Sequence, residues 1–152
     1  MTQQDLQILL VEDNPNDVKL TLHALQNGRL ANSIHVVRDG EEALDFLFCR
    51  GEFAQRSPDH PPRLVLLDLK LPKVDGLEVL RQLKGDPRTK AIPVVVLTSS
   101  REERDLVESY RLGVNAYIQK PVEFESFRQA VKQIGLFWLV INEPPPAQAF
   151  RG

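Results

Sequence analysis

Charged and hydroxyl side chains follow four apolar stretches of the sequence. They are Glu12 and Asp13 after the first stretch, Asp68 after the third, Thr98, Ser99 and Ser100 after the fourth, and Lys120 after the fifth. An ionised carboxylate at the edge of an apolar core loses hydration unless a positive or hydrogen-bonding group replaces the water. Asp68 is therefore either a paired structural group or part of a functional site, and its neighbours must decide which.

The chemistry of this set depends on whether the side chains meet. Carboxylates that are held close together raise one another's pKa unless a cation lies between them, and Lys120 alone could not neutralise three of them. Oxygen ligands without His or Cys favour Mg²⁺, which keeps several waters and often takes a phosphate oxygen. A divalent cation and Lys120 would leave room for a dianionic phosphoryl group, with the Thr98 hydroxyl donating to one of its oxygens.

The surrounding pattern predicts the elements that would bring these side chains together. Strand-length apolar runs lie at 6–11, 33–37, 63–67, 92–97 and 116–118. Segments of helical period lie at 14–28, 39–51, 75–87, 100–113 and 122–139. Five strands that alternate with five helices predict a doubly wound α/β fold, with a parallel sheet covered on both faces. In such folds the site lies beyond the carboxyl ends of the strands.

Composition excludes several other classes of protein. The chain has 152 residues, a formal net charge of −2 and no run of Lys or Arg, which argues against binding to nucleic acid or to an anionic membrane. No apolar run approaches the length of a membrane span, so we expect a cytoplasmic protein. The single cysteine, Cys49, excludes an intramolecular disulfide and lies in an apolar stretch typical of packing. The three histidines, His23, His35 and His60, show no metal-ligand spacing.

Four motifs carry a resemblance to a known family. The stretches LLVEDN, LVLLDLKLPKVDG, VVVLTSS and AYIQKPV, in this order, resemble the receiver domain of bacterial two-component response regulators over residues 5–139. The resemblance implies a flavodoxin-like receiver fold with strand order 2-1-3-4-5. The FWL stretch near the C-terminus and the proline-containing loop at 51–62 are most similar to single-domain regulators that partner phytochromes. We therefore expect a receiver domain at 1–139, a C-terminal tail at 140–152 and no separate output domain.

The resemblance implies a role for each acidic residue of the set. Asp68 would be the phosphoacceptor, attacking the phosphoryl group of a phosphohistidine on a sensor kinase. Asp13, Asp68 and the backbone carbonyl of Lys70 would bind Mg²⁺ directly, and Glu12 would bind it through water. Phosphoryl transfer needs chiefly positioning and charge neutralisation, which a metal and a lysine supply.

The resemblance implies that further residues of the four motifs stabilise and sense the phosphoryl group. Lys120 would pair with a phosphoryl oxygen, and Thr98 would turn its hydroxyl onto the phosphate. Tyr117 would swing inward to fill the space that Thr98 leaves. Pro121 follows Lys120 either through a cis peptide bond or as an ordinary first helical residue, and the sequence leaves both open.

The expected function is that of a signalling protein. It would accept a phosphoryl group from a sensor histidine kinase, of the phytochrome type by resemblance, and signal through protein contacts. It would be no enzyme beyond its own phosphorylation and dephosphorylation. One alternative is a Mg²⁺-dependent phosphohydrolase of the haloacid dehalogenase type, but that mechanism needs an aspartate where Lys70 stands. Another is a binding module that works without phosphorylation.

The apolar stretch LFWLVI at 136–141 leaves two interpretations open. It could close the protein's own core, or it could expose Trp138, Leu139 and Ile141 to a second copy of the chain. The second interpretation predicts a homodimer through the fourth and fifth helices and the C-terminal tail.

Overall fold

The computed structural model describes residues 6–27, 33–99, 101–102 and 112–136. Its centre is a sheet of five parallel strands in the order β2-β1-β3-β4-β5. The strands are β1 Leu6–Val11, β2 Ser33–Val37, β3 Leu64–Asp68, β4 Val94–Thr98 and β5 Ala116–Gln119. The predicted fold class and strand order are thus confirmed, and each predicted strand lies within two residues of the observed one.

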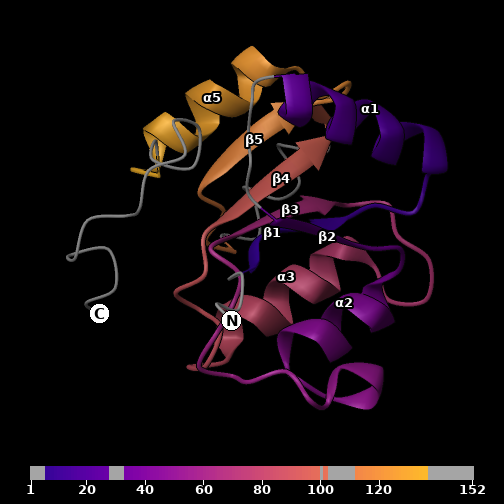
Figure 1. Cartoon of the computed structure of the whole chain (residues 1–152), viewed down its shortest axis with the longest axis vertical. Coiled ribbons are helices and arrows are strands. Elements are labelled where there is room, and N and C mark those ends of the chain that lie inside the picture. The colour runs from indigo at the N-terminus through magenta and orange to yellow at the C-terminus, as the bar shows by residue number, and fades with distance from the viewer. Residues whose placement is uncertain (1–5, 28–32, 100, 103–111, 137–152) are drawn as a thin grey trace.

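Helices cover both faces of this sheet (Figure 1). They are α1 Pro15–Asn27, α2 Gly40–Leu47, α3 Gly76–Gly85 and α5 Phe124–Gln133. Helices α1 and α5 lie on one face, and α2 and α3 lie on the other. The predicted helix at 100–113 falls largely outside the described residues. Among the helices that the structure does describe, none combines the length and the apolar character needed to cross a bilayer.

The last helix ends earlier than its apolar pattern predicts. We expected a helix to residue 139, but α5 ends at Gln133. Gly135 follows with a positive φ of 83°, and the backbone N–H of Leu136 donates to the carbonyl of Val131 at 2.7 Å. A glycine in the left-handed conformation is a common helix terminator because it has no Cβ to clash. The segment after Leu136, including the LFWLVI residues of the dimer hypothesis, lies outside the described residues.

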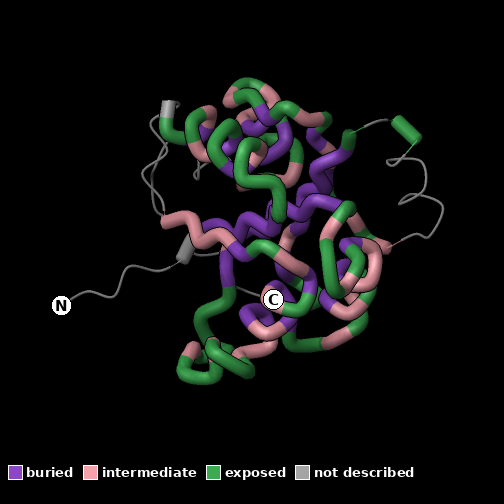
Figure 2. Tube along the Cα trace, turned by 90° about the vertical axis from the view of Figure 1, so that its right-hand side faces the viewer, coloured by how far each residue is buried: buried purple, intermediate pink, exposed green. Residues whose placement is uncertain are grey.

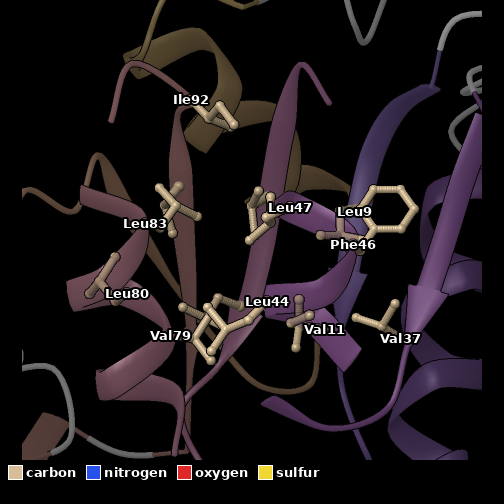
Figure 3. Close-up of a cluster of buried hydrophobic side chains, with 14 of the residues drawn as sticks. Leu9, Val11, Val37, Leu44, Phe46, Leu47, Val79, Leu80, Leu83 and Ile92 are labelled. Atoms are coloured by element: carbon tan, nitrogen blue, oxygen red, sulfur yellow. The ribbon is translucent and has the colours of Figure 1, made fainter. Parts of the chain in front are cut away.

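Alternation along the strands divides the apolar side chains between two cores. Ile8 and Leu10 of β1 face α1 and α5, whereas Leu9 and Val11 face α2 and α3. Figure 2 shows that the buried residues follow the strands and the inner sides of the helices. Figure 3 shows the second core, where side chains of α2 and α3 pack over the strands. Every residue of β3 and β4 is buried, as expected for central strands covered on both faces.

The long connection between α2 and β3 is partly structured. It contains a short 3₁₀ helix, Gly51–Phe53, within the proline-containing loop at 51–62. The Arg56 guanidinium lies 3.8 Å from the centre of the Phe46 ring and donates to the carbonyls of Phe46 and His60. These contacts attach the loop to the end of α2 and leave Cys49 half-buried.

Two glycines lie so close to the loop between β3 and α3 that a Cβ atom at either position would clash with its backbone. A Cβ on Gly76 would lie 2.6 Å from the backbone oxygen of Asp68, and one on Gly40 would lie 1.8 Å from that of Val74. The Gly76 N–H donates to the carbonyl of Leu69 at 3.1 Å. Glycine is therefore required at position 76, beside the backbone of Asp68, and at position 40, beside the following loop at Val74.

Candidate functional site

The predicted residues meet at the edge where the parallel strands end. Glu12 directly follows β1, and its N–H donates to the carbonyl of Val37 at the end of β2 at 3.0 Å. Asp68 is the last residue of β3, and Thr98 is the last residue of β4. Lys120 follows β5, and its N–H donates to the Thr98 carbonyl at 2.8 Å, continuing the strand pairing. The strand order thus places all four residues at one edge of the sheet, as predicted.

The ammonium group of Lys120 is the centre of the site. Its Nζ lies 3.1 Å from Oε1 of Glu12, 3.2 Å from Oδ2 of Asp68 and 3.0 Å from Oδ2 of Asp17. The side chain of Lys120 is only 15% exposed, and those of Glu12 and Asp68 are 0% and 3% exposed. Such contacts are charge-assisted hydrogen bonds that water screens little.

Asp17 is the one member of this group that the sequence analysis missed. It lies in the first turn of α1, where an acidic residue is favoured by the helix dipole alone. The Oδ1 atom of Asn14 accepts from the N–H groups of Asn16 and Asp17 at 2.9 and 3.1 Å, which fixes this turn. The available signal was its position in the first turn of the helix that follows Glu12 and Asp13.

Three carboxylates of the site could hold a metal ion together. Glu12, Asp13 and Asp68 each offer an oxygen, and these oxygens all lie within 4.8 Å of one another. Glu12 and Asp68 are buried, whereas Asp13 is exposed and leaves that side open to water. An all-oxygen set with access for water fits a hard divalent cation such as Mg²⁺.

Hydrogen bonds orient the carboxylates of this set. The second oxygen of Glu12, Oε2, accepts from the N–H of Asn14 at 3.3 Å. The Oδ1 atom of Asp68 accepts from the N–H of Lys70 at 3.3 Å, and the side chain of Lys70 is exposed. Asp68 is thus held between a backbone donor on one oxygen and the Lys120 ammonium on the other.

The charges of the site alter the pKa values of two groups. The pKa of Glu12 is raised to about 7, chiefly by burial and also by the neighbouring Asp68, while Lys120 opposes the shift. Burial by itself would lower the pKa of Lys120, but the bond to Asp17 and the charges of Asp68 and Glu12 more than compensate. The pKa of Lys120 therefore lies above its ordinary value, and the ammonium is fully protonated at neutral pH.

The two residues expected to act as a switch lie in different surroundings. Thr98 is buried at the end of β4 and is paired in register with Gln119. Tyr117 is half-buried and packs against the core on the α2 and α3 side of the sheet. The peptide bond between Lys120 and Pro121 is cis.

Comparison with known proteins identifies the family. Residues 8–132 match the model of the response regulator receiver domain. The probable methanogenesis regulatory protein FilR2 of Methanothrix harundinacea is 46% identical over 138 residues, which cover 91% of this chain and 86% of that protein. Response regulator Rcp1 of a Synechocystis species is 44% identical over 140 residues, which cover 92% and 93% of the two chains.

Solved structures agree with the sequence relatives. The bacteriophytochrome response regulator AtBRR is 57% identical, with a TM-score of 0.85 over 93% of this chain and 100% of that one. The Mn²⁺-bound form of Rcp1 has a TM-score of 0.71 at 41% identity, over 93% of this chain and 99% of that one. With its strand order and the residues gathered at the edge of its sheet, the chain belongs to the response regulator receiver domain family.

Proposed function

We propose that this receiver accepts a phosphoryl group on Asp68 from the phosphohistidine of a sensor histidine kinase. The observation that carries the proposal is the position of the Asp68 carboxylate. It lies 3.2 Å from the Lys120 ammonium and within 4.8 Å of oxygens from Glu12 and Asp13. A carboxylate so placed is buried, oriented and next to groups that can neutralise an incoming anion.

The transfer exchanges one bond to phosphorus for another. An oxygen of Asp68 forms a bond to phosphorus while the bond between phosphorus and the kinase imidazole nitrogen breaks, and that nitrogen keeps the electron pair. Lys120 donates to a phosphoryl oxygen, and Lys70 holds Asp68 through its backbone N–H. Dephosphorylation by water returns the free carboxylate and inorganic phosphate.

A divalent metal completes the proposed site. Mg²⁺ bound here supplies positive charge to the phosphoryl oxygens. Asp13, Asp68 and the backbone carbonyl of Lys70 would hold it directly, and Glu12 would hold it through water. The all-oxygen set supports this assignment, as does the Mn²⁺-bound structure of the relative Rcp1.

The response to phosphorylation is assigned to Thr98 and Tyr117. The Thr98 hydroxyl would move onto the phosphoryl group, and Tyr117 would move inward behind it. The buried position of Thr98 next to Lys120 and the half-buried position of Tyr117 on the same strand pair support this assignment. Such a change would alter the surface around β4 and β5 that a partner protein contacts.

The partner assignments rest on the relatives. A kinase of the phytochrome type is supported by the similarity to AtBRR, a bacteriophytochrome response regulator. We place the phosphoryl transfer in the cytoplasm, with the receiver domain at 1–139 and the tail at 140–152 as a dimer contact.

The phosphohydrolase alternative is not favoured, because the exposed Lys70 occupies the position where that mechanism needs a second aspartate.

Phosphotransfer to the wild type and to Asp68→Asn tests the proposal. A radiolabelled kinase and acetyl phosphate serve as separate donors, each with and without Mg²⁺. Label on the wild type alone, and only with Mg²⁺, is the expected result. Equal label on Asp68→Asn would show that another residue is the phosphoacceptor. The absence of label from both donors would refute the proposed function. Release of phosphate from small phosphate esters would instead indicate a phosphohydrolase.

A further inference from the structure

Asp17 makes the shortest of the three contacts to the ammonium group of Lys120. The distance from Nζ to Oδ2 of Asp17 is 3.0 Å, against 3.1 Å to Glu12 and 3.2 Å to Asp68. Asp17 differs from the other two in origin, since it belongs to a helix and not to a strand end. It also differs in exposure, since its side chain is 29% exposed and theirs are almost completely buried.

The number of hydrogens on the ammonium group limits what Lys120 can bind at one time. A protonated lysine has three N–H donors, and the structure gives it three carboxylate acceptors from three different elements. A phosphoryl oxygen can accept one of these hydrogen bonds only if one of the carboxylates no longer accepts it. Arrival of the phosphoryl group is therefore an exchange of acceptors on Lys120.

Asp17 is the acceptor that can leave at least cost. Glu12 is fully buried and is also held by the N–H of Asn14, while Asp68 is also held by the N–H of Lys70. Both also belong to the set of carboxylates that could hold a metal, and Asp17 does not. A partly exposed carboxylate regains water when its partner leaves, whereas a buried one would stay unsatisfied.

The negative charge of Asp17 also disfavours binding of the phosphoryl group, as its hydrogen bond to Lys120 does. Three carboxylates contact the single ammonium of Lys120, Asp13 adds a fourth carboxylate near Glu12 and Asp68, and the group that is to be transferred is itself an anion. Asp17 thus accepts a Lys120 hydrogen bond that the phosphoryl group needs, and its negative charge lies close to where the phosphoryl group would bind.

We propose that Asp17 is a positioning residue of the phosphorylation site, which competes with the phosphoryl group for the Lys120 ammonium and so slows phosphorylation of Asp68. This inference rests on the function proposed above. The first turn of α1, where Asp17 lies, loses its contact with Lys120 when Asp68 is phosphorylated.

The test compares Asp17→Asn and Asp17→Ala with the wild type. The rate constant for phosphorylation by acetyl phosphate, at saturating Mg²⁺, is expected to rise about three- to fivefold in both variants, the range of a partly exposed ion pair. Asp59→Asn is the matched control, because it removes the same charge from an exposed residue before β3, at the opposite end of the strands. Its rate constant should equal that of the wild type.

A second measurement examines the contact without metal or phosphoryl donor. A double-mutant cycle of Asp17→Asn and Lys120→Met, followed by chemical unfolding, should give a coupling of about three- to fivefold in the unfolding constant. Zero coupling overturns the proposal, as do Asp17 variants that are phosphorylated at the wild-type rate or more slowly. A wild type that accepts no label from any donor would instead refute the proposed function, and the inference with it.

Discussion

Replacing Lys120 with methionine removes the ammonium group and keeps most of the apolar stem. Two of the three carboxylates that lose their partner, Glu12 and Asp68, are 0% and 3% exposed. Loss of one partner of a buried ion pair costs about 3–5 kcal/mol, because the remaining charge stays buried without compensation. The contact with the more exposed Asp17 adds less than about 1 kcal/mol. We therefore expect the free energy of unfolding to fall by about 3–5 kcal/mol at pH 8 without divalent metal.

The pH dependence of this loss identifies its cause. In the wild type the pKa of Glu12 is raised to about 7, and Lys120 holds it below the value that burial and Asp68 alone would give. In the variant the folded state therefore takes up a proton more readily than the unfolded state does. The free energy of unfolding of the variant should then increase as the pH falls from 8 to 6, by up to about 1.4 kcal/mol per pH unit.

Urea unfolding followed by circular dichroism at pH 8 and pH 6 measures both effects. Lys132→Met, which removes an exposed lysine of α5, is the matched control and should change stability by less than about 0.5 kcal/mol. Excess Mg²⁺ should stabilise the Lys120 variant, since the proposed metal site exists only in the folded state. A loss below about 1 kcal/mol at pH 8, or a loss that does not depend on pH, would refute the assignment of Lys120 as the group that neutralises the buried carboxylates.

Three further perturbations examine the surroundings of the site. Gly76→Ala places a Cβ 2.6 Å from the backbone oxygen of Asp68. Urea unfolding should therefore show a loss of about 1–3 kcal/mol in the free energy of unfolding, and Mg²⁺ titration should show a weaker affinity. Unchanged values would contradict the close approach. Asp13→Asn alters an exposed carboxylate, so stability should stay within about 0.5 kcal/mol while the Mg²⁺ dissociation constant rises at least about tenfold; unchanged affinity would remove Asp13 from the metal set. Burial lowers the pKa of His35, which stacks on Phe46, so the unfolded state binds a proton first and the wild type should lose stability relative to His35→Phe as the pH falls below about 6.5. Unfolding at pH 7.5 and pH 5.5 measures that difference, and a difference independent of pH would show that His35 is not buried in its neutral form.

The sequence was sufficient for the strands and for most of the site because both follow from one rule. Apolar runs of strand length that alternate with helical segments predict a parallel sheet, and the ends of parallel strands lie at one edge. The meeting of Glu12, Asp68 and Lys120 follows from that rule without any knowledge of side-chain geometry. The roles of these residues in phosphoryl transfer remain predictions.

Asp17 and the end of α5 could not be predicted in the same way. Helical periodicity tells which residues share a face of a helix, but not which strand end that face meets. Asp17 also had an adequate local explanation in the first turn of α1. The helix end depends on the backbone of Gly135, because the apolar spacing continues past it.

The contacts of Lys120 also have a consequence for the order in which the molecule assembles. They join residues that are 108, 103 and 52 positions apart in the chain, and the lysine is the last of the four to be synthesised. Until β5 pairs with β4, the acidic side chains made earlier have no ammonium beside them and retain their water. Contacts across such long loops form late in folding because the loops must close first. The charged centre therefore appears only in a molecule whose sheet is complete, and an unfinished chain cannot present it to a partner.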